Sequence, residues 1–128
     1  MIYLDTSVAL AYLLTEDRTL PDSIWQELLV SSRLLEYEIW NRIHAHGLAH
    51  SHGDEVRALI GRVALIELAP PVLARALEPF PIAVRTLDAL HLSAIEFLRS
   101  RRQVVKLATY DNKMLAGARA LGIPIYEL

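Results

Sequence analysis

The sequence contains no cysteine among its 128 residues, which excludes disulfide bonds, thiolate metal ligands and a cysteine nucleophile. Aromatic residues are scarce at 7%, whereas apolar residues of all kinds reach 53%, so a globular protein with an aliphatic core is expected. No apolar run approaches the roughly 20 residues that a membrane-spanning helix needs. The first residues contain neither a basic region nor a signal-like apolar core. These absences together predict a cytoplasmic protein without a membrane segment.

The chain also lacks a large excess of charge of either sign, since its net charge is −2. The charges are nevertheless unevenly distributed. Residues 1–56 contain three basic and nine acidic side chains, whereas residues 57–106 contain eight basic and four acidic ones. A local concentration of arginine and lysine can bind a phosphate backbone even when the total charge is negative. Solvated helix faces explain the same pattern equally well, so both interpretations stay open.

Short apolar segments alternate with longer helical ones along the whole chain. The expected strands cover residues 2–4, 29–32, 63–68, 104–109 and 123–126, and the expected helices cover residues 8–14, 24–28, 34–49, 54–62, 72–77, 88–98 and 112–121. The proline-containing segment 79–86 is expected to be a loop. Strands that are separated by helices usually pair in parallel through right-handed crossovers. The pattern therefore predicts an α/β domain with a mostly parallel sheet.

Two aspartates, Asp5 and Asp111, follow expected strands closely. The carboxyl ends of parallel strands lie at one edge of the sheet, where binding sites collect, so these two side chains are predicted to lie at the same edge. Each aspartate also precedes an expected helix. At that position a carboxylate commonly caps the helix and interacts favourably with its dipole. For either residue alone, helix capping is the more common explanation.

Two further acids, Glu38 and Asp88, lie in expected helices. Asp88 begins the most apolar helix of the chain, which should be central, so a deep position is predicted and helix capping is the alternative. Glu38 shares a helix face with Leu34 and Leu35, which predicts that it points inward. Glu36, two residues earlier, is the alternative acid of this segment.

These four acids would repel one another if they met in one cleft. Two unit charges about 4 Å apart cost on the order of 4 kcal/mol at an effective dielectric constant of about 20. Cations or bound protons must offset that cost. Carboxylate oxygens are the preferred ligands of Mg²⁺ and related hard cations. The pattern therefore predicts a divalent metal site.

The residues around the four acids resemble the motifs of the PIN-domain ribonucleases, and within them the VapC-type toxins of VapBC toxin–antitoxin pairs. The opening IYLDTSVAL is similar to the first family motif, LLEYEIWNRI to the second, RTLDALHLSAI to the third and ATYDNKMLAGARALGIPI to the last. The resemblance covers essentially the whole length. It implies one PIN-like domain over residues 1–128, folded as a three-layer α/β/α sandwich with a short, mostly parallel sheet.

This resemblance also implies an activity, which is metal-dependent endonucleolytic cleavage of RNA. One or two Mg²⁺ or Mn²⁺ ions would bind Asp5, Glu38, Asp88 and Asp111, and a metal-activated water would attack the phosphate. Thr6 and Thr109 would orient a water or a carboxylate. The basic cluster Arg99, Arg101 and Arg102 is a candidate RNA contact. The family further implies a homodimer and a VapB-like antitoxin that silences the site.

Two other functions remain as alternatives. A catalytically silent PIN-like module would bind RNA or a protein without cutting. An aspartate-based phosphatase or phosphoreceiver would use Asp5 as its nucleophile, but Ser7 stands where such phosphatases usually have a second aspartate. His46 and His50 are four residues apart, a spacing that suits metal ligands, although a solvated helix end explains them better. His91 follows Asp88 by three residues, a spacing that would bring it to the cleft, although packing in the core explains it better.

Overall fold

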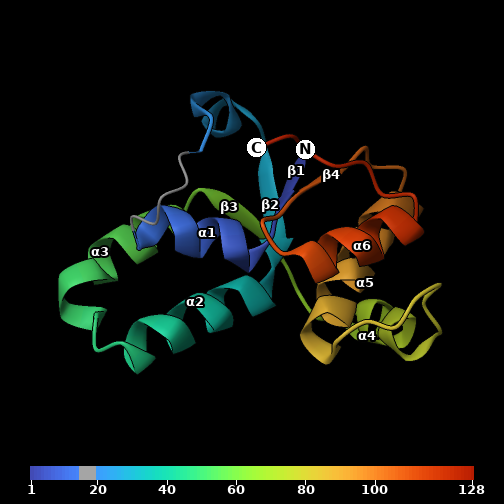
Figure 1. The fold of residues 1–128 in the computed structure, drawn as a ribbon, viewed down its shortest axis with the longest axis horizontal. Coiled ribbons are helices and arrows are strands. Elements are labelled where there is room, and N and C mark those ends of the chain that lie inside the picture. The colour runs from blue at the N-terminus through green and yellow to red at the C-terminus, as the bar shows by residue number, and fades with distance from the viewer. Residues whose placement is uncertain (15–19) are drawn as a thin grey trace.

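The computed structural model describes residues 1–14 and 20–128. In these residues a sheet of four parallel strands has the order β3-β2-β1-β4. Helices cover both faces of this sheet (Figure 1). The predicted α/β class with a parallel central sheet is therefore confirmed.

The strands are β1 (Ile2–Leu4), β2 (Leu29–Ser32), β3 (Val63–Ile66) and β4 (Lys106–Ala108). The helices are α1 (Thr6–Leu13), α2 (Arg33–Ala45), α3 (Ala49–Ile60), α4 (Pro70–Leu77), α5 (Thr86–Ser100) and α6 (Asn112–Ala120), with a 3₁₀ helix at Asp22–Gln26.

Strand β1 joins the two helical layers because successive side chains of a strand point to opposite faces. Ile2 and Leu4 pack with Ile39 in the core formed with α1, α2 and α3. Tyr3 packs with Leu92 in the core formed with α4, α5 and α6. Figure 1 shows these two groups of helices on opposite sides of the sheet. The residue that follows β1 therefore lies between the two layers.

The predicted helix over residues 34–49 is wrong at its end, and the predicted start of the next helix at residue 54 is wrong too. Helix α2 stops at Ala45 and α3 begins at Ala49. Between them Gly47 has a φ of 65°, in the left-handed region that glycine enters without steric cost. The chain turns here and folds α3 back along α2, as the packing of the two helices requires.

The predicted strand over residues 123–126 is also wrong. In the described residues only an isolated bridge joins Leu107 to Ile125, through hydrogen bonds from Leu107 N–H to Pro124 O and from Tyr126 N–H to Leu107 O, both 2.8 Å. Pro124 has no N–H group to donate, and so the pairing does not extend. The predicted helix over residues 24–28 is a 3₁₀ helix that begins two residues earlier.

The order of the strands creates a crevice between β1 and β4. The chain leaves β1 into α1 on one face of the sheet and leaves β4 into α6 on the other (Figure 1). In open α/β sheets the crevice at such a switch point, outside the carboxyl ends of the strands, is the usual binding site.

None of the helices in the described parts of the chain is long and apolar enough to cross a membrane.

Candidate active site

A cleft of about 400 Å³ opens at this crevice. Its walls come from the β1–α1 junction, α2, the first turn of α5 and the β4–α6 junction. The lining residues include Asp5, Thr6, Ser7, Glu38, Arg42, Arg85, Asp88, His91 and Asp111. The structure therefore brings the four acids from distant parts of the sequence to one cleft.

Asp5 occupies the N-cap position of α1, but its side chain makes no capping hydrogen bond. Its Oδ2 instead accepts hydrogen bonds from Ser7 Oγ at 2.6 Å and from Thr109 Oγ1 at 2.8 Å. The residue is only 6% exposed. The two hydroxyl groups hold the carboxylate across the junction of β1 and β4, so the capping explanation is wrong for Asp5.

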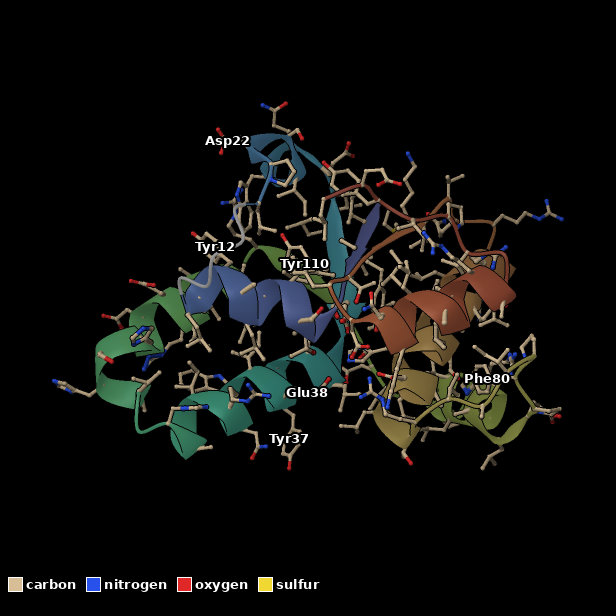
Figure 2. The ribbon with its side chains drawn as sticks, in the orientation of Figure 1. Tyr12, Asp22, Tyr37, Glu38, Phe80 and Tyr110 are labelled. Atoms are coloured by element: carbon tan, nitrogen blue, oxygen red, sulfur yellow. The ribbon has the colours of Figure 1, made fainter. Side chains whose placement is uncertain are left out.

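Glu38 lies on the inner side of α2. Figure 2 shows it toward the middle of the molecule, whereas its neighbour Tyr37 points outward. Glu38 Oε1 accepts hydrogen bonds from Thr6 Oγ1 at 2.9 Å and from His91 Nε2 at 2.6 Å. Glu36 does not line the cleft and forms an exposed ion pair with Arg33 at 3.1 Å. Between the two candidate acids of this segment, the geometry favours Glu38.

For His91 the sequence favours packing in the core over an approach to the cleft, and the structure places this residue in the wall of the cleft. The ring is buried and connects two partners: Nε2 contacts Glu38, and Nδ1 lies 2.8 Å from the hydroxyl of Tyr3. A carboxylate only accepts hydrogen bonds, so Nε2 carries a proton, and in a neutral ring Nδ1 then accepts from Tyr3. Burial raises the pKa of Tyr3 above its ordinary value, which keeps this phenol protonated as a donor.

Asp88 and Asp111 are joined by one arginine. Arg85 Nε donates to Asp88 Oδ2 at 2.7 Å, and Arg85 Nη2 donates to Asp111 Oδ2 at 2.6 Å. Helix α5 begins at Thr86 with Arg85 as its N-cap residue. Asp88 therefore lies in the first turn instead of capping the helix, and the capping explanation is wrong for it.

For Asp111 the capping explanation is correct. Its Oδ1 accepts from the backbone N–H groups of Lys113 at 2.8 Å and Met114 at 3.2 Å, while Oδ2 contacts Arg85. Burial by itself raises the pKa of Asp111, but the Arg85 hydrogen bond, the two backbone hydrogen bonds and the Arg85 charge outweigh it and hold the pKa below its ordinary value. This carboxylate is ionised at neutral pH, as a metal ligand must be.

The donor set of the cleft suits a hard cation, because four carboxylates supply only oxygen ligands. The described residues nevertheless contain no group of three or more histidine and acidic side chains in a geometry that could hold an ion. Every one of the four acids already accepts hydrogen bonds: Asp5 and Glu38 from hydroxyl groups, Glu38 also from His91, and Asp88 and Asp111 from the shared Arg85. The residues therefore fit Mg²⁺ or Mn²⁺ in chemistry, and ion binding requires that some of these contacts rearrange.

The predicted basic cluster does not line the cleft. Arg99 donates to the carbonyl groups of Leu121 at 3.1 Å and Gly122 at 3.3 Å, and Arg101 lies over the ring of Phe97. These residues and Arg102 stand at the end of α5, about 16 Å or more along the helix from Asp88 at 1.5 Å per residue. Among the residues that the structure describes, the arginines that line the cleft are Arg42 and Arg85. Arg85 precedes Asp88 by three residues, and this spacing could have identified Arg85 from the sequence as a partner of Asp88.

The other histidines lie away from the cleft. His46 and His50 are exposed, and His44 stacks on Trp40 with ring centroids 5.6 Å apart. In the described part of the chain they form no metal-binding group. The exposure of His46 and His50 supports their interpretation as residues of a solvated helix end.

Comparisons with known proteins agree with this arrangement. A model of the PIN domain matches residues 2–122. Two ribonucleases of Mycobacterium tuberculosis are similar over nearly their whole length. VapC47 is 29% identical over 95% of this chain and 93% of its own, and VapC35 is 28% identical over 98% and 95%. A chain of a toxin–antitoxin complex from Klebsiella pneumoniae has the same fold, with a TM-score of 0.63 over the full length of both chains at 14% identity.

Proposed function

This chain belongs to the PIN-domain family, and we propose that it is a metal-dependent endoribonuclease, the toxin of a toxin–antitoxin pair. The observation that carries the proposal is the meeting of Asp5, Glu38, Asp88 and Asp111 in one cleft at the β1–β4 crevice. The similar M. tuberculosis proteins are ribonucleases by name. Residues 1–128 would act as one domain.

In this proposal the four acids hold one or two Mg²⁺ or Mn²⁺ ions, directly or through water. A bound ion would lower the pKa of a water nucleophile and stabilise charge on the phosphate and the leaving oxygen. The protein keeps the carboxylates in place: Thr109 and Ser7 hold Asp5, and Thr6 and His91 hold Glu38. Such outer hydrogen bonds fix the orientation of ligands and tune their basicity. No side chain acts as a covalent nucleophile.

The substrate would enter as single-stranded RNA, whose unstacked bases can bend into a cleft. Arg42 lines the cleft and is exposed, so it is well placed to contact the backbone phosphates. The assignment of Arg99, Arg101 and Arg102 to RNA stays a prediction, and their distance from the acids means that they would contact RNA beyond the cleavage point.

The proposed partners are a VapB-like antitoxin and a second copy of this chain. The similar Klebsiella chain comes from a toxin–antitoxin complex. Exposed apolar side chains of α4 (Leu73 and Leu77) and of the segment that follows it (Ile82) line a hollow of about 690 Å³. Contiguous apolar surface of this kind is typical of protein–protein contacts.

The direct test uses the purified chain and a pool of structured RNAs. We expect cleavage with Mn²⁺ or Mg²⁺, loss of cleavage with EDTA and recovery when excess metal is returned. A chain that binds the RNAs but leaves them uncut with either metal would be the silent PIN-like module. Cleavage that EDTA does not reduce would contradict the metal-dependent mechanism.

A further prediction concerns His91 as a positioning residue. Replacing His91 by leucine removes the donor to Glu38, and loss of such an outer hydrogen bond typically costs about 10- to 100-fold in activity or metal affinity. His91→Gln places an amide donor near the position of Nε2 and should recover part of the loss. Initial rates at saturating RNA, with thermal unfolding measured in parallel, check both variants. Equal activity of His91→Leu and the parent would contradict the positioning role.

A further inference from the structure

We propose that Arg85 is a built-in counter-cation, which holds Asp88 and Asp111 when no metal is bound and competes with the divalent ion for these two carboxylates. The two ion pairs that it forms are called the Arg85 bridge below. The proposal rests on the proposed function, because it assumes that the two aspartates are metal ligands.

The Arg85 bridge is tight and joins separate parts of the site. One guanidinium donates from Nε to Asp88 in α5 and from Nη2 to Asp111 at the start of α6, at 2.7 and 2.6 Å. Hydrogen bonds between two ionised groups at these lengths are among the strongest in proteins. The guanidinium of Arg85 stays protonated in proteins, so a permanent cation lies between the two carboxylates.

A metal ion and the bridge need the same oxygens. Arg85 contacts Oδ2 of both aspartates, and Oδ1 of Asp111 is already used by the backbone of α6. An ion placed between the two carboxylates would lie within a few ångströms of the guanidinium, where like charges repel strongly. The guanidinium and the ion therefore exclude each other from this position.

The Arg85 side chain is exposed enough to move away from the two aspartates. Its side chain is 52% exposed, whereas the side chains of Asp88 and Asp111 are 12% and 31% exposed. The residue ends the loop between α4 and α5, so its side chain can swing into solvent while both helices stay packed. Competition can therefore proceed by movement of one flexible side chain.

The test measures Mn²⁺ affinity by calorimetry on metal-free protein, without RNA. We expect Arg85→Gln to bind Mn²⁺ more tightly than the parent by at least about tenfold, because the loss of one charge-assisted contact corresponds to about this factor and Arg85 makes two such contacts. Arg42→Gln is the matched control, since it removes the same charge from the same cleft, whereas both ion pairs of the two aspartates are made by Arg85. Arg85→Lys keeps the charge without the forked geometry and should fall between parent and Arg85→Gln.

Thermal unfolding gives an independent reading. In EDTA, Arg85→Gln should unfold a few degrees, about 2–5 °C, below the parent, because two carboxylates lose their shared counter-charge. Mn²⁺ should then raise its unfolding temperature by more than that of the parent.

The outcomes separate the two proposals. If Arg85→Gln binds Mn²⁺ more weakly than the parent, or no more tightly than Arg42→Gln does, the competition is refuted while the metal site stands. If neither the parent nor Arg85→Gln binds Mn²⁺, both the competition and the proposed metal-dependent function fail. If Arg85→Gln binds Mn²⁺ more tightly than both the parent and Arg42→Gln, the competition is supported. This result does not depend on knowing the RNA substrate.

Discussion

Asp5→Asn should reduce RNA cleavage by more than about 100-fold, because loss of even an outer hydrogen bond to a metal ligand costs about 10- to 100-fold. Asp5 is one of the four acids of the proposed metal site and directly follows β1, where its backbone N–H donates to Ala108 O of β4. Asparagine has the same shape and can still accept from Ser7 and Thr109 with its amide oxygen. It lacks the negative charge, and its amide nitrogen does not bind a hard cation. The loss should therefore appear in the rate of cleavage and in Mn²⁺ affinity.

The fold should survive this substitution. Neutralising one of four neighbouring acids removes repulsion, so the unfolding temperature in EDTA should be equal to or higher than that of the parent. Asp22→Asn is the matched control: Asp22 is exposed and lies in the 3₁₀ helix, far from Glu38 in Figure 2. A folded Asp5→Asn protein that cuts RNA at the rate of the parent would remove the basis of the proposed mechanism.

Glu38→Gln and Glu36→Gln should behave very differently. Glu38 lines the cleft and is held by Thr6 and His91, so its replacement should also lower cleavage by more than about 100-fold, beyond the usual cost of an outer contact. Glutamine keeps an oxygen that accepts both hydrogen bonds, so the protein should stay folded. Glu36 forms an exposed ion pair with Arg33 and does not line the cleft. A change there should alter the rate by no more than about twofold, which corresponds to the roughly 0.5 kcal/mol that surface substitutions usually cost.

Single-turnover rates on one RNA, with circular dichroism of each variant, compare the two. The pair is a strict comparison because both residues lie in α2, two positions apart, and undergo the same chemical change. A larger loss from Glu36→Gln than from Glu38→Gln would mean that the acid of this segment has been assigned to the wrong residue.

Local patterns predicted much of the fold correctly. The strand at residues 2–4 and the helix near residues 112–121 follow from short apolar runs with clear turn signals, and Gly122 ends the last helix with a φ of 71°. The inward direction of Glu38 followed from its spacing from Leu34 and Leu35, because a helix places such residues on one face. These predictions hold because each depends on neighbours within one or two turns.

Other predictions failed at the ends of elements and where contacts between separate elements decided the outcome. The segment 123–126 has the composition of a strand, yet the described chain gives it a single bridge to Leu107, since Pro124 interrupts the pairing. Helix α5 begins at Thr86 and not at Asp88. This excludes helix capping, the alternative for Asp88, and places the residue in the first turn, where Arg85 holds it. A local pattern does not contain the second contact of Arg85, with Asp111, which lies 26 residues later.

The sequence by itself determined the class of fold, the four acids and the face on which Glu38 lies, because propensity, periodicity and residue chemistry act over short stretches of chain. Only the tertiary structure decided which basic and neutral groups hold those acids: Arg85 between Asp88 and Asp111, His91 and Tyr3 behind Glu38, and Thr109 across from Asp5. These partners are 3 to 104 residues apart in the chain, and most meet only when parallel strands and packed helices bring their ends to one edge of the sheet.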